Sequence, residues 1–182
     1  MAQLSIIIRY THQGRRTKHD HTFKDSQMIT TDNRKPPFIR VIAICLFRYK
    51  ERILVFQGFD QSSGTYFYRP LGGGVDAGET SAQAIVREIR EEVGAEVTQL
   101  QLLAVLESLF TVNGRAGHEI VFVYDGCFVD KTLYNQPLIE AVEDNGEALQ
   151  ATWRALSFFN GHHRLVPEAL VELLTAHQAS SG

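Results

Sequence analysis

Residues 73–95 read GGVDAGETSAQAIVREIREEVGA, and this stretch contains the signals that begin and end one helix. Thr80 followed three residues later by Gln83 matches a capping box, which is typical of a helix N-terminus. Gly94 stands where a residue in the left-handed region would end the helix. The pattern therefore predicts a helix over residues 81–93.

The predicted helix carries an apolar stripe and a group of three glutamates. At about 100° per residue, the apolar side chains are expected on one side, and they are Ala82, Ile85, Val86, Ile89 and Val93. Glu88, Glu91 and Glu92 are expected on the other side, where like charges three or four residues apart weaken a helix. Two interpretations follow, a solvated acidic surface or a site for a hard cation such as Mg²⁺, which prefers carboxylate oxygens.

The wider spacing separates these interpretations, because the stretch resembles the Nudix box, written G-x5-E-x7-R-E-U-x-E-E-x-G-U with U a bulky aliphatic residue. All seven invariant positions are filled, by Gly73, Glu79, Arg87, Glu88, Glu91, Glu92 and Gly94. Ile89 fits the first aliphatic position, whereas Ala95 at the last is smaller than the family pattern. Seven specified residues at fixed spacing match by chance in roughly one window per 10⁸.

The resemblance implies an α/β fold, a Nudix-type α/β/α sandwich with a mixed β-sheet between helices, over residues 38–178. The implied activity is that of a pyrophosphohydrolase, which cleaves a phosphoanhydride bond in a nucleoside diphosphate-linked substrate. The implied cofactor is Mg²⁺, with Mn²⁺ as a substitute. The alternative is a nucleotide-sensing or regulatory protein of the same fold without catalysis. The intact box argues for catalysis, since a sensor would lose its metal carboxylates without penalty.

The resemblance also assigns roles to residues of the box. The implied metal ligands are Glu88, Glu91, Glu92 and the backbone carbonyl of Gly73, and the implied catalytic residues are Glu91, Glu92 and Arg87. Arg87 is expected to orient Glu88 or Glu79, because a guanidinium forks onto a carboxylate. Glu79 lies just before the helix N-terminus, where negative charge is favoured, and is expected to have an accessory, structural role.

Residues outside the invariant positions of the box are given roles from their position in the sequence. Arg69, Gly72 and Gly74 are expected to bind substrate phosphate, with the glycines forming a tight bend. Glu119 begins an apolar strand and is an accessory candidate, either a base or metal ligand or a surface carboxylate. An acidic stretch, Glu140, Glu143, Asp144 and Glu147, is interpreted as a solvated loop rather than the source of an additional catalytic glutamate.

The remaining pattern alternates strands with a final helix. Strands are predicted for residues 39–47, 53–56, 66–69, 100–109, 119–128 and 151–156, of which the first two form a hairpin. A C-terminal helix is predicted with Pro167 near its first turn and with Leu170, Val171, Leu173 and Leu174 covering a packing face. Trp153, Phe158 and Phe159 are expected in the core.

Residues 1–37 differ in composition from the rest of the chain. They hold seven basic and three acidic residues and are interpreted as a flexible arm, within which residues 4–10 are a candidate edge strand. Nucleic acid is an unlikely partner because the arm lacks interleaved aromatic residues. The remainder holds 11 basic and 18 acidic residues, a charge that repels polyphosphate unless cations intervene. Residues 179–182 are expected to form a disordered tail.

The composition also limits location and partners. Because the chain has no run of about 18 apolar residues and no signal-like apolar core, we expect a cytoplasmic protein with no membrane partner. Cys45 and Cys127 lie in apolar runs and are expected to be buried free thiols. The expected partner is a small-molecule nucleotide, and a homodimer is left open. No proline lies between Pro70 and Pro137, which argues against an ADP-ribose enzyme by resemblance.

Overall fold

The computed structural model describes residues 7–8, 38–142, 146 and 148–179. Its helices are α1 (Ser81–Val93) and α2 (Ala169–Ala179), with short 3₁₀ turns η1 (Lys131–Asn135) and η2 (Leu156–Phe158). Its strands are β1 (Ile7–Ile8), β2 (Arg40–Tyr49), β3 (Arg52–Asp60), β4 (Thr65–Gly74), β5 (Val97–Val112), β6 (Arg115–Phe128), β7 (Leu138–Val142), β8 (Ala148–Ala155) and β9 (His163–Leu165).

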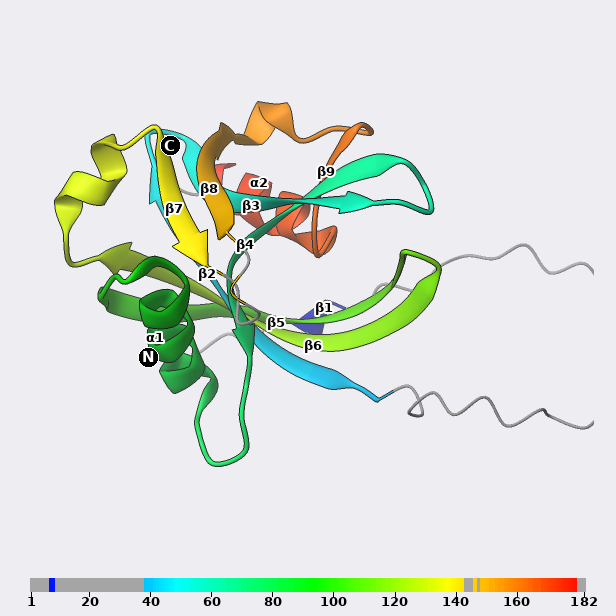
Figure 1. Ribbon diagram of the computed structural model, residues 1–182, viewed down its shortest axis with the longest axis horizontal. Helices are drawn as coiled ribbons and strands as arrows, with labels where there is room; N and C mark the ends of the chain where they lie inside the picture. The colour runs from blue at the N-terminus through cyan, green and yellow to red at the C-terminus, as the bar shows by residue number, and fades with distance from the viewer. Residues whose placement is uncertain (1–6, 9–37, 143–145, 147, 180–182) are drawn as a thin grey trace, which may run out of the picture.

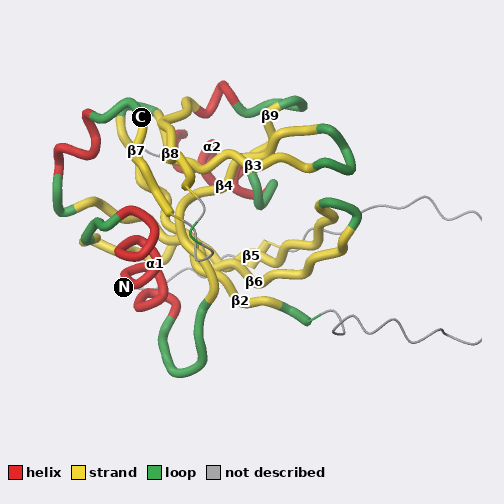
Figure 2. The backbone as a smooth tube through the Cα atoms, viewed as in Figure 1, coloured by secondary structure: helices red, strands yellow, loops and turns green. Residues whose placement is uncertain are grey.

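The strands form one mixed sheet in the order β1-β5-β6-β2-β4-β3-β8-β7, with β9 paired to β4. The pairs β1–β5, β2–β6 and β4–β9 are parallel, and the other pairs are antiparallel. β4 changes partner along its length: residues 65–70 pair with β3, and residues 71–74 pair with β2. The sheet therefore separates into two arms that meet at β4, as Figures 1 and 2 show.

Each face of the sheet packs against one helix. Alternate residues of β2 point to opposite faces, so Cys45 and Phe47 pack with Ile85 of α1 while Leu46 packs with Leu170 of α2. The α1 core also contains Phe56, Phe128 and Trp153, and the α2 core contains Val121, Val123 and Leu174. This arrangement confirms the predicted α/β/α sandwich with a mixed sheet between helices.

Several predicted elements agree with the structure. α1 has the predicted bounds, Thr80 and Gln83 form the capping box, and Gly94 ends the helix with φ 64°. The predicted first hairpin is β2–β3, whose turn residues Lys50 and Glu51 both have positive φ. Trp153 is buried, at 7% exposure, in the α1 core.

Other predictions need correction. Gly72, Gly73 and Gly74 lie in β4 and pair with β2, so they do not form the predicted bend. The strands β7 and β9 were not predicted, and Glu140 lies in β7 rather than in a loop. These differences arise because short strands and glycine-containing strands give weak local signals.

The remaining predictions on the termini and cysteines are met only in part. Ile7–Ile8 pairs in parallel with β5 as a short edge strand, and the rest of the predicted arm lies outside the described residues. Ala179, which was predicted to begin the tail, is the last residue of α2, and residues 180–182 lie outside the described residues. Cys45 is buried and Cys127 is half-buried, and both are free thiols. Within the described residues, no helix is long and apolar enough to cross a membrane.

Asp60 joins the tips of the β3–β4 and β5–β6 hairpins. Its carboxylate is 5% exposed and accepts hydrogen bonds from the Ser62 N–H (3.0 Å), the Ser62 and Ser63 hydroxyls (2.6 and 2.7 Å) and the Asn113 N–H (2.9 Å). The Asn113 side-chain oxygen accepts a bond from the Gln61 N–H at 2.8 Å. Hydrogen bonds from the Ser62 and Ser63 hydroxyls and from the Asn113 N–H hold the pKa of Asp60 below its usual value.

We predict that Asp60→Asn lowers the thermal midpoint by several degrees at pH 7, because asparagine has one acceptor oxygen in place of two and the hydroxyl of Ser62 or Ser63 then loses its acceptor. The lowered pKa means that this contribution is present above the ordinary carboxyl pKa of about 3.9 and is lost as pH falls through the folded-state value. Melting curves from pH 7 to pH 3 should therefore show the two proteins converging only below about pH 4. Glu51→Gln, at an exposed turn position, is the control. A gap between wild type and Asp60→Asn that closes above pH 5 would contradict the assignment.

Candidate active site

The acidic residues of α1 do not share one exposed side. Glu88 and Glu92 are buried, at 6% and 7% exposure, whereas the Glu91 side chain is 51% exposed. Glu88 follows Ile85 by three residues and Glu92 follows Ile89 by three residues, so all four side chains project from one face of the helix onto the sheet. The predicted separation of apolar and acidic sides is therefore wrong, and a solvated acidic surface does not describe Glu88 or Glu92.

Gly73 of β4 makes room for the Glu88 carboxylate. A Cβ added at Gly73 would lie 2.5 Å from both Cδ and Oε1 of Glu88 and 2.6 Å from Oε2. These separations are shorter than any van der Waals contact, so a larger residue would displace the carboxylate. The absence of a side chain at position 73 therefore determines where Glu88 lies.

Glu92 is held against the same strand one residue nearer the part of β4 that pairs with β3. Its Oε2 accepts a hydrogen bond from the Gly72 N–H at 3.2 Å, and its Oε1 lies 3.9 Å from Nη2 of Arg69. Arg69 also donates to the Gly72 carbonyl oxygen at 3.0 Å. Gly72 has φ 124°, and an added Cβ there would lie 2.3 Å from the Ala43 carbonyl oxygen, so only glycine suits this position.

Arg87 connects the loop before α1 to the acidic residues. It donates to both oxygens of Glu79 (3.2 and 2.7 Å), to Glu88 Oε1 (2.9 Å), to Glu91 Oε2 (3.0 Å) and to the Gly74 carbonyl oxygen (2.8 Å). The bonds with Glu79 raise the pKa of Arg87 most, and the same contact lowers the pKa of Glu79. Arg87 thus contacts both carboxylates that the sequence offered as its partner.

Glu79 fixes the loop between β4 and α1. Its Oε1 accepts from the Asp76 N–H at 2.9 Å, in addition to the paired bonds from Arg87. The carboxylate therefore joins the loop backbone to the helix. This geometry agrees with the structural role that was expected for it.

Glu119 lies on β6, away from the α1 face. Strand alternation places it on the face of Val121 and Val123, which pack in the α2 core. Its carboxylate accepts a hydrogen bond from Arg40 at 3.4 Å. Burial raises the pKa of Glu119 above its usual value, and the charges of Arg40 and Arg69 offset only part of this rise. The Arg40 contact was not predicted, because only the parallel pairing of β2 with β6 brings these two residues together.

The carboxylates of α1 do not form a complete metal site by themselves. Among the described residues, no group of three or more His, Cys, Asp or Glu side chains forms a ready metal cage. Instead, Glu88 and Glu92 contact arginines and a backbone N–H, so their oxygens do not converge on one point. The donors are all oxygen, and an ion such as Mg²⁺ commonly takes only one or two protein carboxylates together with water and substrate phosphates.

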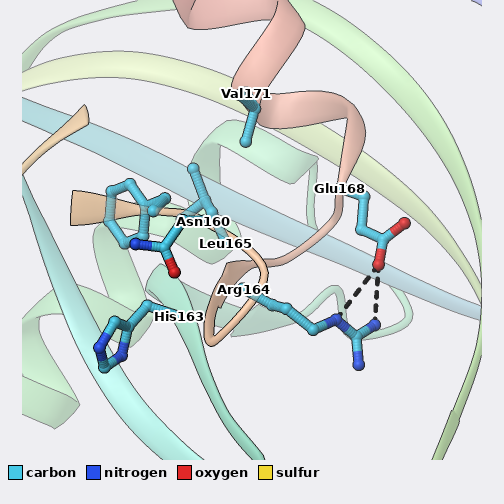
Figure 3. A pocket seen from close by; sticks show the side chains of 7 residues that line it. Asn160, His163, Arg164, Leu165, Glu168 and Val171 are labelled. Atoms are coloured by element: carbon cyan, nitrogen blue, oxygen red, sulfur yellow. Dashed lines mark hydrogen bonds and ion pairs between the residues drawn. The ribbon is translucent and has the colours of Figure 1, made fainter. Parts of the chain in front are cut away.

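A separate groove lies beside α2 and β9, on the other face of the sheet. Its lining residues are Phe159, Asn160, His163, Arg164, Leu165, Glu168 and Val171. Arg164 donates to Glu168 through Nε (3.2 Å) and Nη2 (2.8 Å), as Figure 3 shows. Leu165 belongs to the α2 core, so this groove is not continuous with the acidic residues of α1.

The chain is similar to known proteins in both sequence pattern and fold. The family profile described as NUDIX domain matches residues 37–168. A MutT NUDIX hydrolase from Burkholderia pseudomallei has a TM-score of 0.53 and 24% identity, covering 75% of this chain and 96% of that one. A MutT protein from Methanosarcina mazei Go1 has a TM-score of 0.52 and 17% identity, covering 81% and 99%. No curated protein matches the chain in sequence.

We predict that Arg87→Lys destabilises the fold by about 2 kcal/mol or more, because a lysine cannot replace a fork of charged hydrogen bonds. The control is Arg90→Lys on the same helix. Arg90 also pairs with a glutamate, Glu96, but both side chains are more than half exposed, at 59% and 58%. Its loss should be within about 0.5 kcal/mol, as for exposed ion pairs. Urea unfolding of both variants measures the difference, and equal losses would show that the Arg87 network adds nothing beyond a surface pair.

Proposed function

Since the chain belongs to the Nudix family and is a pyrophosphohydrolase of that family, we propose that it is a divalent-cation-dependent enzyme acting on a nucleoside diphosphate-linked substrate, such as a nucleoside triphosphate. One observation carries the proposal: Glu88 and Glu92 are buried beside the glycines of β4, while Glu91 of the same helix remains exposed. α1 therefore carries two buried carboxylates and one accessible carboxylate within the five residues from Glu88 to Glu92.

The burial of two carboxylates argues for a functional site. Removing a carboxylate from water costs several kcal/mol even after the protein relaxes, and an apolar residue of similar volume would often be as stable. Arg87 and Arg69 offset part of this cost for Glu88 and Glu92 respectively. A binding role explains why charged residues occupy positions that face the core.

The residues fit a hard cation through their oxygen donors. The proposed ligands are Glu88, Glu91, Glu92 and the Gly73 carbonyl oxygen, with Mg²⁺ as the ion and Mn²⁺ as its substitute. When bound, such an ion neutralises charge on phosphate oxygens and lowers the pKa of a water molecule. The protein's own contribution is to hold the carboxylates in place before the substrate arrives.

Arg87 and the Gly72 N–H hold two of the proposed ligand carboxylates, and the third is exposed to solvent. Arg87 fixes the Glu88 carboxylate, the Gly72 N–H fixes Glu92, and Glu91 has the solvent access needed to meet a phosphate or an attacking water. Arg69, with its side chain 34% exposed beside Glu92, is placed to bind a phosphate oxygen of the substrate. Glu79 acts through Arg87 and keeps the loop closed against the helix.

We predict that Glu92→Gln lowers kcat by a factor of about 10² or more, the scale of losing a preorganised electrostatic group. Glutamine keeps an oxygen that accepts from the Gly72 N–H, and it removes one of three neighbouring negative charges, so the metal-free thermal midpoint should not fall. The rise in midpoint on adding Mg²⁺ should shrink, because a ligand stabilises a fold according to its affinity for the native state.

The measurement pairs phosphate release from a panel of nucleoside triphosphates with thermal midpoints, each with and without Mg²⁺. Glu96→Gln, with a side chain 58% exposed just after α1, controls for the loss of one negative charge. Wild-type turnover in Glu92→Gln, or full wild-type activity in excess EDTA, would overturn the proposed metal role. A collapsed metal-free midpoint would mean that Glu92 acts in folding instead.

We also predict that Gly73→Ala lowers kcat at least about tenfold while changing stability by less than about 1 kcal/mol. The three heavy atoms nearest to the new Cβ all belong to the Glu88 carboxylate, at the far end of a flexible side chain, so the overlap is relieved when the carboxylate leaves its place beside β4. Gly161→Ala is the matched control, since a Cβ there would have no neighbour within 4 Å. Activity equal to wild type in Gly73→Ala would show that the Glu88 position is unimportant.

A further inference from the structure

An exposed apolar surface continues from the acidic residues along the same face of the sheet. Strand alternation places Val41 on the face of Ala43 and Cys45, both of which pack in the α1 core. Val41 is 41% exposed, Ile39 just before β2 is 56% exposed, and Leu109 of β5 is 72% exposed. Figure 1 shows β2, β5 and β6 extending beyond α1, so this part of the sheet lies beside the helix.

The strand register joins these apolar residues to a polar pair. Val41 pairs with Ile120 of β6, which pairs in turn with Glu107 of β5. In the next row, His118 pairs with Leu109, and the His118 Nε2 lies 3.0 Å from Glu107 Oε1. The imidazole and carboxylate are 29% and 54% exposed, so both are accessible within an apolar surface.

The distance from the acidic residues suits one substrate molecule. Ala43 pairs with Gly73, whose missing side chain receives Glu88, and Val41 is two residues farther along β2. A strand rises about 3.3 Å per residue, so Val41 is roughly 7 Å from that point and the His118 row is roughly 7 Å farther. A phosphate held beside Gly73 therefore leaves the far end of a nucleotide over Val41, His118 and Leu109.

We propose that this surface binds the nucleobase of the substrate; its side chains are those of Ile39, Val41, Ile120, Leu109, His118 and Glu107. The inference rests on the proposed function. Apolar side chains offer a flat contact for either face of a base, and the imidazole and carboxylate supply a donor and acceptors for its polar edge. Glu107 positions the His118 ring through their hydrogen bond.

The size of the surface favours a small molecule over a second copy of the chain. Stable protein interfaces use about 20 to 30 residues on each side, whereas six side chains form this surface. Its continuity with Gly73 and Glu88 gives a further reason, since a ligand that contacts both regions gains from each. A dimer remains a distinguishable outcome of the experiment.

The experiment compares Leu109→Ser and His118→Ala with wild type in steady-state hydrolysis of the four common nucleoside triphosphates. Both variants should raise KM about tenfold with kcat within twofold, as for loss of uniform substrate binding. Inhibition by inorganic pyrophosphate, which has no base, should not change. Glu107→Gln should alter the order of preference among the four bases, because an amide presents a donor where the carboxylate presented an acceptor.

Val129→Ser is the control, since Val129 is 56% exposed outside this surface. If wild type hydrolyses no nucleotide with Mg²⁺, the proposed function fails. If wild type is active but Leu109→Ser, His118→Ala and Glu107→Gln keep its KM and base preference, the base-binding surface is wrong. A concentration-dependent dimer that Leu109→Ser dissociates, with unchanged KM, would also overturn the proposal and assign the surface to self-association.

Discussion

The burial of Glu88 against Gly73 is the contact on which the rest of the site depends. A carboxylate can approach a strand this closely only where the strand has no side chain, and an added Cβ would come within 2.5 Å of it. The desolvation cost of this position is offset by Arg87, which also holds Glu79 and the Gly74 carbonyl oxygen. One helix, one loop and one strand are therefore fixed relative to each other by a single charged residue.

The position of β4 in the sheet makes that contact available. Residues 71–74 of β4 leave β3 and pair with β2. This change of partner places the glycines of β4 under α1, while Arg69 remains paired with β3 in the other arm of the sheet. Arg69 reaches back to Glu92 and to the Gly72 carbonyl oxygen across this change of partner. At the opposite ends of the two arms, Asp60 and Asn113 join the hairpin tips. The relative position of the arms is thus fixed at two separate points.

The sequence predicted the features that depend on neighbouring residues and failed on those that depend on pairing between distant ones. The ends of α1 follow from Thr80, Gln83 and Gly94, which act within one turn, and they were predicted correctly. The glycines of β4 were assigned to a bend because glycine usually weakens a strand. Their close approach to Glu88 and to the Ala43 carbonyl oxygen comes from residues far along the chain. The Arg40 contact with Glu119, across β2 and β6, was missed for the same reason.

The arrangement separates what determines the bond to be cleaved from what determines the group attached to it. The acidic residues, Arg87 and the glycines come from one segment of about two dozen residues, so their geometry is set largely by α1 and the end of β4. The proposed base-binding residues come from β2, β5 and β6, and their side chains are partly exposed, so they can change without disturbing either core. Under the proposed function, the phosphate end of the site is constrained by buried charge while the base end is not. This asymmetry explains why the sequence motif points to a reaction but not to a substrate.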